Sequence, residues 1–147
     1  MTSLPAPEAV LHGVSVCIFR DRDVLLVRRA KAPGIGRWAP VGGGIEPGET
    51  AEAAAAREVA EETAVEMRLV GHVGTREIVP EPAAASPWAA IRLEVFAAVW
   101  LAGEPVAGSD AAEARFVAVA AVESYDLMPG VAPWIAAARR LFDGQER

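Results

Sequence analysis

The chain has 147 residues, which is enough for one substantial hydrophobic core but not for two, so a single domain is expected. With 52% apolar and 23% charged residues, the composition excludes a mostly disordered chain. The formal net charge of −6 argues against a protein that coats nucleic acid or an anionic membrane, because both attract basic surfaces. An anionic substrate would therefore need help from a bound cation or a few arginines.

The cysteine content and the composition of the first residues favour a cytoplasmic protein. Cys17 is the only cysteine, which excludes an intramolecular disulfide and a zinc site built from thiolates. Residues 1–9 contain two prolines and neither a basic region nor a long apolar run, and they predict a short tail. The most apolar later stretch is interrupted by Arg92 and Glu94 and is too short to span a membrane. We expect one domain over residues 10–143.

The first half of the domain predicts a hairpin, a loop and a helix. Residues 10–19 alternate as a half-buried strand does, with one set of apolar side chains on each face, and residues 24–29 follow a charged turn as a second strand. Residues 31–44 are rich in glycine and proline and predict a loop. From Thr50, a good N-cap residue, the alanine-rich run predicts a helix over residues 51–63.

The second half predicts more strands and a final helix. Residues 65–79 are extended and broken by Gly71 and Gly74, the prolines of residues 80–87 predict a loop, and residues 91–100 alternate as a long strand. Residues 112–119 predict a shorter strand, and Pro133 begins a helix that ends near residue 142. This order predicts an α/β (α+β) domain, in which a mixed sheet carries helices on its faces as an α/β/α sandwich.

Three acids crowd the end of the first predicted helix. Side chains three and four residues apart share a helix face, so Glu58 lies near both Glu61 and Glu62. Like charges at these spacings repel each other, and Mg²⁺ or Mn²⁺, which prefer carboxylate oxygens, would relieve the repulsion. One cysteine and two separated histidines make zinc or iron a poorer fit. The alternative interpretation is an ordinary solvated acidic face.

The segment from residue 43 to residue 65 resembles the Nudix box, which is written G-x5-E-x7-R-E-U-x-E-E-x-G-U with U an aliphatic residue. Eight of the nine defined positions match, namely Gly43, Glu49, Arg57, Glu58, Val59, Glu61, Glu62 and Val65. The exception is Ala64, where the family has glycine. Alanine in a left-handed cap would cost about 1 kcal/mol, or else the helix would end in another way.

The resemblance covers roughly residues 10–142 and is to Nudix hydrolases of the ADP-ribose pyrophosphatase-like group. It implies a metal-dependent hydrolase in which Glu58, Glu61 and Glu62 hold Mg²⁺, with the backbone carbonyl of Gly42 or Gly43 as a further ligand. The metal would neutralise charge on the diphosphate and lower the pKa of a bound water. The family pattern also implies that Arg57 pairs with Glu49 and fastens the glycine loop to the helix, the alternative being a direct catalytic role for Arg57.

The sequence offers more than one candidate for the general base. Glu58 or Glu62 could serve, but related enzymes often use an acid from a distant loop, for which Asp110 and Glu113 are the candidates. The alternative interpretation is that these two acids lie in a solvated turn and have no catalytic role.

The substrate-binding candidates are Gly42 and Gly43, whose backbone would lie near a diphosphate, and several side chains before them. Trp38 could stack on a base or ribose, or could equally cover the core. Three arginines could clamp phosphates, or could simply be solvated at strand ends, namely Arg28, Arg29 and Arg37. Weaker candidates for lining a cleft are Arg92, Glu94, Phe96 and Trp88. His12 and His72 have no expected catalytic duty.

The resemblance implies hydrolysis of a nucleoside diphosphate derivative, with ADP-ribose as the first substrate to try. Family members that cleave ADP-ribose often carry a proline after the box, and Pro80 and Pro82 lie 15 and 17 residues past its end. The first alternative is a nucleoside triphosphate pyrophosphohydrolase that removes damaged nucleotides. An alternative of another class is a non-catalytic nucleotide-sensing domain. The expected partner is a small nucleotide substrate, and the chain could also form a homodimer. Nucleic acid polymers and membranes are not expected as partners.

Overall fold

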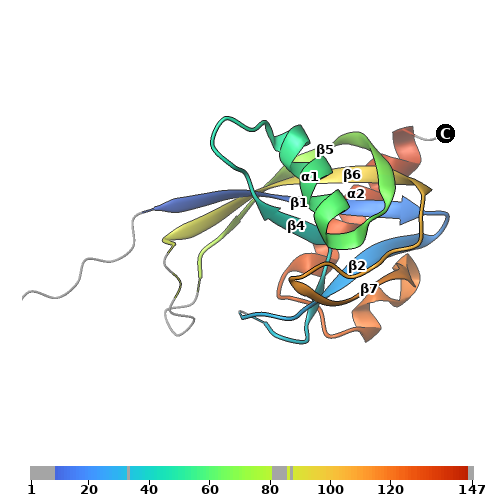
Figure 1. Ribbon diagram of the computed structural model, residues 1–147. Coiled ribbons are helices and arrows are strands. Elements are labelled where there is room, and N and C mark those ends of the chain that lie inside the picture. The colour runs from blue at the N-terminus through green and yellow to red at the C-terminus, as the bar shows by residue number, and fades with distance from the viewer. Residues whose placement is uncertain (1–8, 33, 81–85, 87, 146–147) are drawn as a thin grey trace, which may run out of the picture.

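The computed structural model describes residues 9–32, 34–80, 86 and 88–145. Its elements are, in chain order, β1 (Val10–Arg20), β2 (Asp23–Arg29), β3 (Trp38–Ala39), β4 (Val41–Gly44), α1 (Ala51–Thr63), β5 (Glu66–Ile78), β6 (Ala90–Ala102), β7 (Ala111–Ala118), the 3₁₀ helix η2 (Val119–Ser124) and α2 (Val131–Gln145). The seven strands form one mixed sheet. Figure 1 shows α1 in front of this sheet and α2 behind it, which is the predicted α/β/α sandwich.

Strand β1 lies at the centre of the sheet. It pairs in parallel with β6 along most of its length and antiparallel with β4 through residues 13–16. Its pairing with β2 is confined to two residue pairs beside the turn, so the predicted hairpin exists but is short. Strand β2 then leaves β1 to pair with β3 and β7, while β5 pairs with the far side of β6. This divergence places β4, β2 and β7 around one end of α1.

Two apolar layers enclose the sheet, one under each helix. On the α1 side, alternate residues of β1 such as Val14, Val16 and Ile18 pack against Ala55 and Val59 of the helix. On the α2 side, the other alternate residues, including Cys17 and Phe19, pack against Ile135 and its neighbours. The predicted alternation is therefore present, but the prediction of a half-buried strand was wrong, because a helix covers each face of β1.

Helix α1 begins and ends as its sequence allows. The Thr50 hydroxyl accepts a hydrogen bond from the Ala53 N–H at 3.1 Å, which caps the first turn. Ala54 and Ala55 have no solvent exposure, because their small side chains let the helix lie close to the sheet. At the other end Ala64 adopts the left-handed conformation, with φ of 62°, and its N–H donates to the Ala60 carbonyl. The helix thus ends in the left-handed conformation that favours glycine, and Ala64 is strained there.

Several boundaries differ from the prediction. The predicted loop over residues 31–44 contains β3 and β4, because the backbone of three glycines pairs with β1 although glycine has no side chain to signal a strand. Strand β5 is continuous and absorbs its glycines as register shifts. Helix α2 begins two residues before Pro133, which has no helical donor to lose in a first turn. Expectations for residues 1–8 and for Pro82 lie outside the described residues. None of the described helices has the length and apolar character needed to cross a membrane.

Candidate active site

A cleft of about 390 Å³ opens on the α1 side of the sheet, where β2, β4 and the last turns of α1 meet. Its walls come from four segments: the end of β2 with the loop after it, the β3–β4 region, α1, and the residue before β7. The residues that line it are Val27, Arg29, Lys31, Ala32, Ala39, Pro40, Val41, Gly42, Gly43, Gly44, Glu58, Glu62 and Asp110. The cleft therefore gathers the glycines of β4, two of the three acids at the end of α1, and Asp110, which are separated in the chain.

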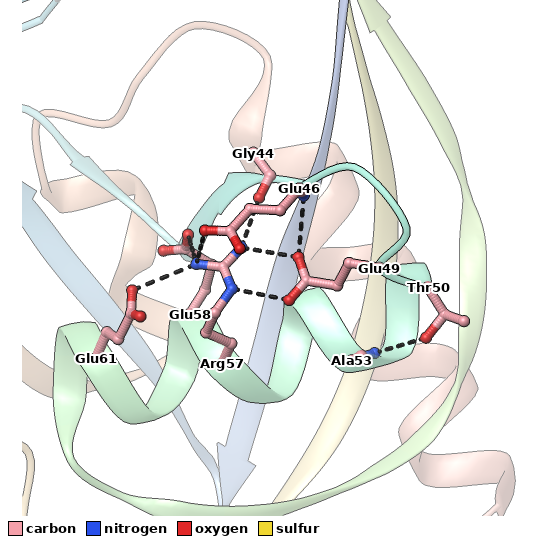
Figure 2. A network of polar contacts seen from close by, with 8 residues as sticks. All are labelled: Gly44, Glu46, Glu49, Thr50, Ala53, Arg57, Glu58 and Glu61. Atoms are coloured by element: carbon pink, nitrogen blue, oxygen red, sulfur yellow. Dashed lines mark hydrogen bonds and ion pairs between the residues drawn. The ribbon is translucent and has the colours of Figure 1, made fainter.

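Arg57 fastens the glycine segment to the helix. Its Nε and Nη2 atoms donate to the two carboxylate oxygens of Glu49 at 2.8 and 2.9 Å, and Nη2 also donates to the Gly44 carbonyl at 2.8 Å. Nη1 donates to Glu58 at 2.8 Å and to Glu61 at 3.3 Å. Figure 2 shows this guanidinium at the centre of the network, between the glycine loop and the helix. The pairing of Arg57 with Glu49 that the resemblance implied is present.

Charge pairing in this network shifts two pKa values in opposite directions. The guanidinium of Arg57 and the Glu46 backbone N–H, both donating to Glu49, lower the pKa of that carboxyl to about 2. The same contacts with Glu49 and Glu58 raise the pKa of Arg57. Both groups are therefore ionised at any pH near neutrality, and the loop anchor is permanent under those conditions.

The glycines are needed because other groups approach their backbone. A Cβ atom on Gly43 would lie 2.5 Å from Oε2 of Glu58, so this carboxylate occupies the space a side chain would take. A Cβ on Gly42 would lie 3.3 Å from the Ser15 Cα and would overlap the carbonyl oxygen of β1 beneath it. At Gly44 the nearest atom would be 3.8 Å away. Two of the three glycines are thus sterically required, one by the acid and one by the strand pairing.

The pKa values of Glu58 and Glu62 are both raised. For Glu58, burial is the main cause of the raised pKa, the Arg57 contact opposes it, and the charges of Glu61 and Asp110 add to it. For Glu62, burial is again first, followed by the charges of Asp110 and Glu58. These groups therefore hold negative charge at a cost, and a cation placed among them would be stabilised.

The chain places Asp110 beside these acids by docking the β6–β7 loop on the end of α1. The N–H groups of Val106 and Gly108 donate to the Thr63 and Glu62 carbonyls, both at 2.8 Å. These carbonyls have no partner within the helix, so the loop satisfies them. A Cβ on Gly108 would lie 2.9 Å from the Glu62 Cα, which leaves no room for a side chain at this contact. The loop thereby fixes the approach of Asp110 to the cleft.

The donor atoms in the cleft fit a hard divalent cation. Within the described ranges, no set of three or more acids, histidines and cysteines is close enough to form a ready-made cage. Mg²⁺ does not need one, because it is usually bound through one or two carboxylates and keeps waters that substrate phosphates can replace. Glu58 and Glu62 supply such carboxylates next to the glycine backbone. The two carboxylates repel each other, and a bound cation would relieve this repulsion.

Glu61, the third acid of the predicted metal set, is placed differently. Its carboxylate is 57% exposed and accepts a hydrogen bond from Arg57, and it does not line the cleft. A role for Glu61 in metal binding stays a prediction.

Two predicted site residues, Arg28 and Glu113, lie on the opposite face of the sheet. Along β2, Val24 and Leu26 belong to the α2 layer, and Arg28 continues that face and pairs with Glu113 on β7 at 3.6 Å. Glu113 itself shares its face with Val117, which is also in the α2 layer. Neither Arg28 nor Glu113 lines the cleft, so the structure does not support them as phosphate clamp and general base.

Trp38 also belongs to the α2 layer. It is 7% exposed, and its ring packs edge-on against Tyr125 with centroids 5.4 Å apart. The structure therefore agrees with the core role that the sequence left open, and contradicts a stacking role. Arg37 is exposed beside Asp126 at 3.8 Å and is likewise outside the cleft.

The weaker candidates on β6 do not reach the cleft either. Arg92 pairs with Glu77 at 3.4 Å, and Glu94 accepts from His72 and Thr75. Phe96 is buried in the α1 layer, and Trp88 is partly buried outside the cleft lining. Cys17 is fully buried, which raises the pKa of its thiol to about 12 and makes it unreactive.

The residue that the sequence reasoning missed is Lys31. It lines the cleft mouth, and its Nζ lies 2.5 Å from Oδ1 of Asp110, a contact that raises the pKa of Lys31. Of the predicted arginines only Arg29 lines the cleft with it. Alternation could have separated Arg28 from Arg29, since neighbouring residues of a strand face opposite sides.

Comparison with known proteins identifies the family of this chain. The NUDIX domain family model matches residues 11–142. The chain is 34% identical over 110 residues to the ADP-ribose pyrophosphatase of Methanocaldococcus jannaschii, and the match covers 75% of this chain but 61% of that protein, which is less than two-thirds of its length. It is also 34% identical over 132 residues to a Mycobacterium tuberculosis protein named "Putative 8-oxo-dGTP diphosphatase 2", with 89% of each chain covered.

Solved structures show the same fold. The MutT NUDIX hydrolase of Burkholderia pseudomallei has a TM-score of 0.75 at 22% identity, with 88% of this chain and 98% of that one covered. The dihydroneopterin triphosphate pyrophosphohydrolase of E. coli has a TM-score of 0.73 at 19% identity, with 92% and 99% covered. The family match and the two sequence relatives support the enzyme class that the resemblance implied, a Nudix pyrophosphohydrolase. The chain belongs to the NUDIX domain family.

Proposed function

We propose that this protein is a Mg²⁺-dependent hydrolase that cleaves the pyrophosphate bond of a nucleoside diphosphate derivative, with ADP-ribose as the leading candidate. The observation that carries the proposal is the convergence of Glu58, Glu62 and Asp110 on one cleft beside the backbone of Gly42 and Gly43. Acids that repel one another at a glycine-lined cleft suit a cation together with a diphosphate.

In this proposal Glu58 and Glu62 hold the cation, with the Gly42 carbonyl as a further ligand. When bound, Mg²⁺ supplies charge neutralisation on the diphosphate and lowers the pKa of a water molecule. Arg57 keeps the glycine segment in place through Glu49 and the Gly44 carbonyl. Its side chain does not line the cleft. It is therefore a positioning residue.

Asp110 is the proposed general base. It lines the same cleft as Glu62. It is not part of the Arg57 network and would be able to accept the proton that an attacking water releases. Arg29, the arginine that lines the cleft, is the proposed phosphate ligand.

ADP-ribose leads the substrate candidates for two reasons. The chain resembles the ADP-ribose pyrophosphatase-like group over most of its length, and the M. jannaschii relative carries that name. Water added across the P–O–P linkage of ADP-ribose gives AMP and ribose 5-phosphate. A cytoplasmic location suits such a nucleotide and agrees with the single buried cysteine.

A nucleoside triphosphate is the second candidate substrate. The M. tuberculosis relative, which is named for 8-oxo-dGTP, is as identical to this chain as the M. jannaschii protein and is matched over 89% of its length. The metal and the acids would be used in the same way, and the products would be a nucleoside monophosphate and pyrophosphate.

A substrate panel tests the proposal. Purified protein is incubated with Mg²⁺ and, separately, with ADP-ribose, NADH, UDP-glucose, dGTP and 8-oxo-dGTP, and the products are identified by mass spectrometry. We expect the highest kcat/KM for ADP-ribose and no turnover after chelation of the metal. Turnover of triphosphates alone would replace ADP-ribose by the second candidate. Failure to hydrolyse any member of the panel would contradict the proposal.

A further inference from the structure

Lys31 is the only lysine in the chain, and it lies at the cleft. The sequence contains 14 basic residues, and the other 13 are arginines. Lysine and arginine differ chemically: the guanidinium is a planar fork that holds carboxylates bidentately, whereas the ammonium is a compact charge whose three donors turn freely. Arg57 is an example of bidentate binding in this protein, since two of its nitrogens donate to the carboxylate of Glu49. A lysine is better suited to a contact that changes its partner.

Lys31 joins the two loops at the mouth of the cleft. Its Nζ donates to Oδ1 of Asp110 at 2.5 Å, and the neighbouring Ala30 N–H donates to the Asp110 carbonyl at 3.3 Å. The side chains of Lys31 and Asp110 are 70% and 57% exposed. Exposed ion pairs contribute little to stability, because water screens them, so this contact can be exchanged at small cost.

The charges around the cleft favour such an exchange. The side chains that line it include three acids, Glu58, Glu62 and Asp110, and two bases, Arg29 and Lys31. An arriving diphosphate carries two negative charges and several acceptor oxygens, so even with a cation bound it offers the ammonium more acceptor oxygens than one exposed carboxylate does.

We propose that Lys31 binds a phosphate oxygen of the substrate and that it leaves Asp110 to do so. Before substrate binds, the ion pair spans the cleft mouth and occupies the carboxylate that is needed as base. Once Lys31 has moved to the phosphate, Asp110 is free beside Glu62, while the docked loop keeps its backbone in place. This inference rests on the proposed function, and it adds a substrate-binding residue and a substrate-triggered release of the base.

The single lysine makes the exchange directly observable. In protein labelled with ¹³C,¹⁵N-lysine, NMR shows one lysine side chain, that of Lys31. The ligand is an ADP-ribose analogue in which a methylene group replaces the bridging oxygen of the diphosphate, added with Mg²⁺, and adenosine serves as the control without phosphate. We expect the analogue, and not adenosine, to shift the ¹⁵Nζ and ¹³Cε signals.

The variant Asp110→Asn separates the two contacts. It should shift the Lys31 signals of the free protein, because the ion pair is lost, but leave those of the analogue complex close to wild type. Signals that still respond to Asp110→Asn in the complex would show that Lys31 keeps its partner, and would overturn the exchange. Signals that do not move when calorimetry shows the analogue to be bound would overturn the inference and leave the proposed function standing.

Kinetics give an independent readout. Lys31→Met should raise KM for ADP-ribose by about tenfold, the loss expected for one charge-assisted contact to phosphate, and Lys31→Arg should restore most of it because the positive charge returns. Arg22→Met removes an exposed positive charge outside the cleft and should change nothing. Equal KM values for Lys31→Met and wild type would refute a phosphate contact. If the wild type neither binds the analogue nor hydrolyses any diphosphate, the proposed function fails together with the inference.

Discussion

The three consecutive glycines of β4 give a prediction that separates catalysis from stability. A Cβ on Gly43 would lie 2.5 Å from Oε2 of Glu58, whereas an ordinary contact needs about 3.5 Å, so Gly43→Ala should displace this carboxylate by about 1 Å. Misplacing a catalytic group by that distance can reduce turnover by about 10²-fold. The fold should survive, because the group that moves is the end of a flexible side chain and the backbone at Gly43 has no positive φ.

The neighbouring glycines are matched controls for that variant. Gly44→Ala adds the same methyl group where the nearest atom is 3.8 Å away, and it should keep both activity and stability. Gly42→Ala would drive a methyl group into the carbonyl of the paired strand, and should lower the free energy of unfolding by about 1–3 kcal/mol. The assay is kcat for ADP-ribose at saturating Mg²⁺, read beside thermal unfolding of each variant. Wild-type turnover in Gly43→Ala, or equal losses in Gly43→Ala and Gly44→Ala, would refute the reasoning.

Three further predictions concern the helix end, the loop anchor and the base. Ala64→Gly should raise the free energy of unfolding by about 1 kcal/mol, because glycine tolerates the left-handed conformation that alanine holds here, and calorimetry should show a melting temperature higher by about 2–4 °C. Glu49→Gln should destabilise the protein most above pH 5: since the pKa of Glu49 is lowered to about 2 in the folded state, its contribution is complete above its unfolded pKa and is lost as the pH falls toward 2. Urea unfolding at a series of pH values would show the wild type and Glu49→Gln converging at low pH, and a difference independent of pH would contradict this origin. Asp110→Asn should reduce kcat by at least about 10²-fold, whereas Glu113→Gln, on the other face of the sheet, should stay within about twofold of wild type, and the reverse order of kcat values would exchange the two assignments.

The elements that the sequence predicted well have a strong periodic signal of their own. Helix α1 follows from an unbroken run of helix formers after Thr50, and β1 follows from alternating apolar residues. The resemblance supplied the Nudix family and the pairing of Arg57 with Glu49, both of which are confirmed. Local rules were sufficient here because each signal lies within a continuous stretch of chain.

The features that the sequence did not predict depend on contacts between distant segments. The backbone of Gly42 to Gly44 forms a strand because β1 lies beside it, and glycine carries no pattern that could announce this. Alternation places Arg28 and Arg29 on opposite faces of β2. The sequence does not show which face α1 covers, and the cleft lies on that face, beside Arg29. Lys31 could have been noticed as the one lysine, but its contact with Asp110 joins loops 79 residues apart.

In the proposed function, the acids of this cleft carry out metal-dependent hydrolysis. The most direct measurement is the rate of AMP formation from ADP-ribose with Mg²⁺ by Glu62→Gln, compared with Glu52→Gln, which removes an exposed acid from the first turn of the same helix. We predict a loss of at least about 10²-fold for Glu62→Gln with its unfolding temperature retained, and wild-type turnover for Glu52→Gln. Wild-type turnover by Glu62→Gln would contradict the account.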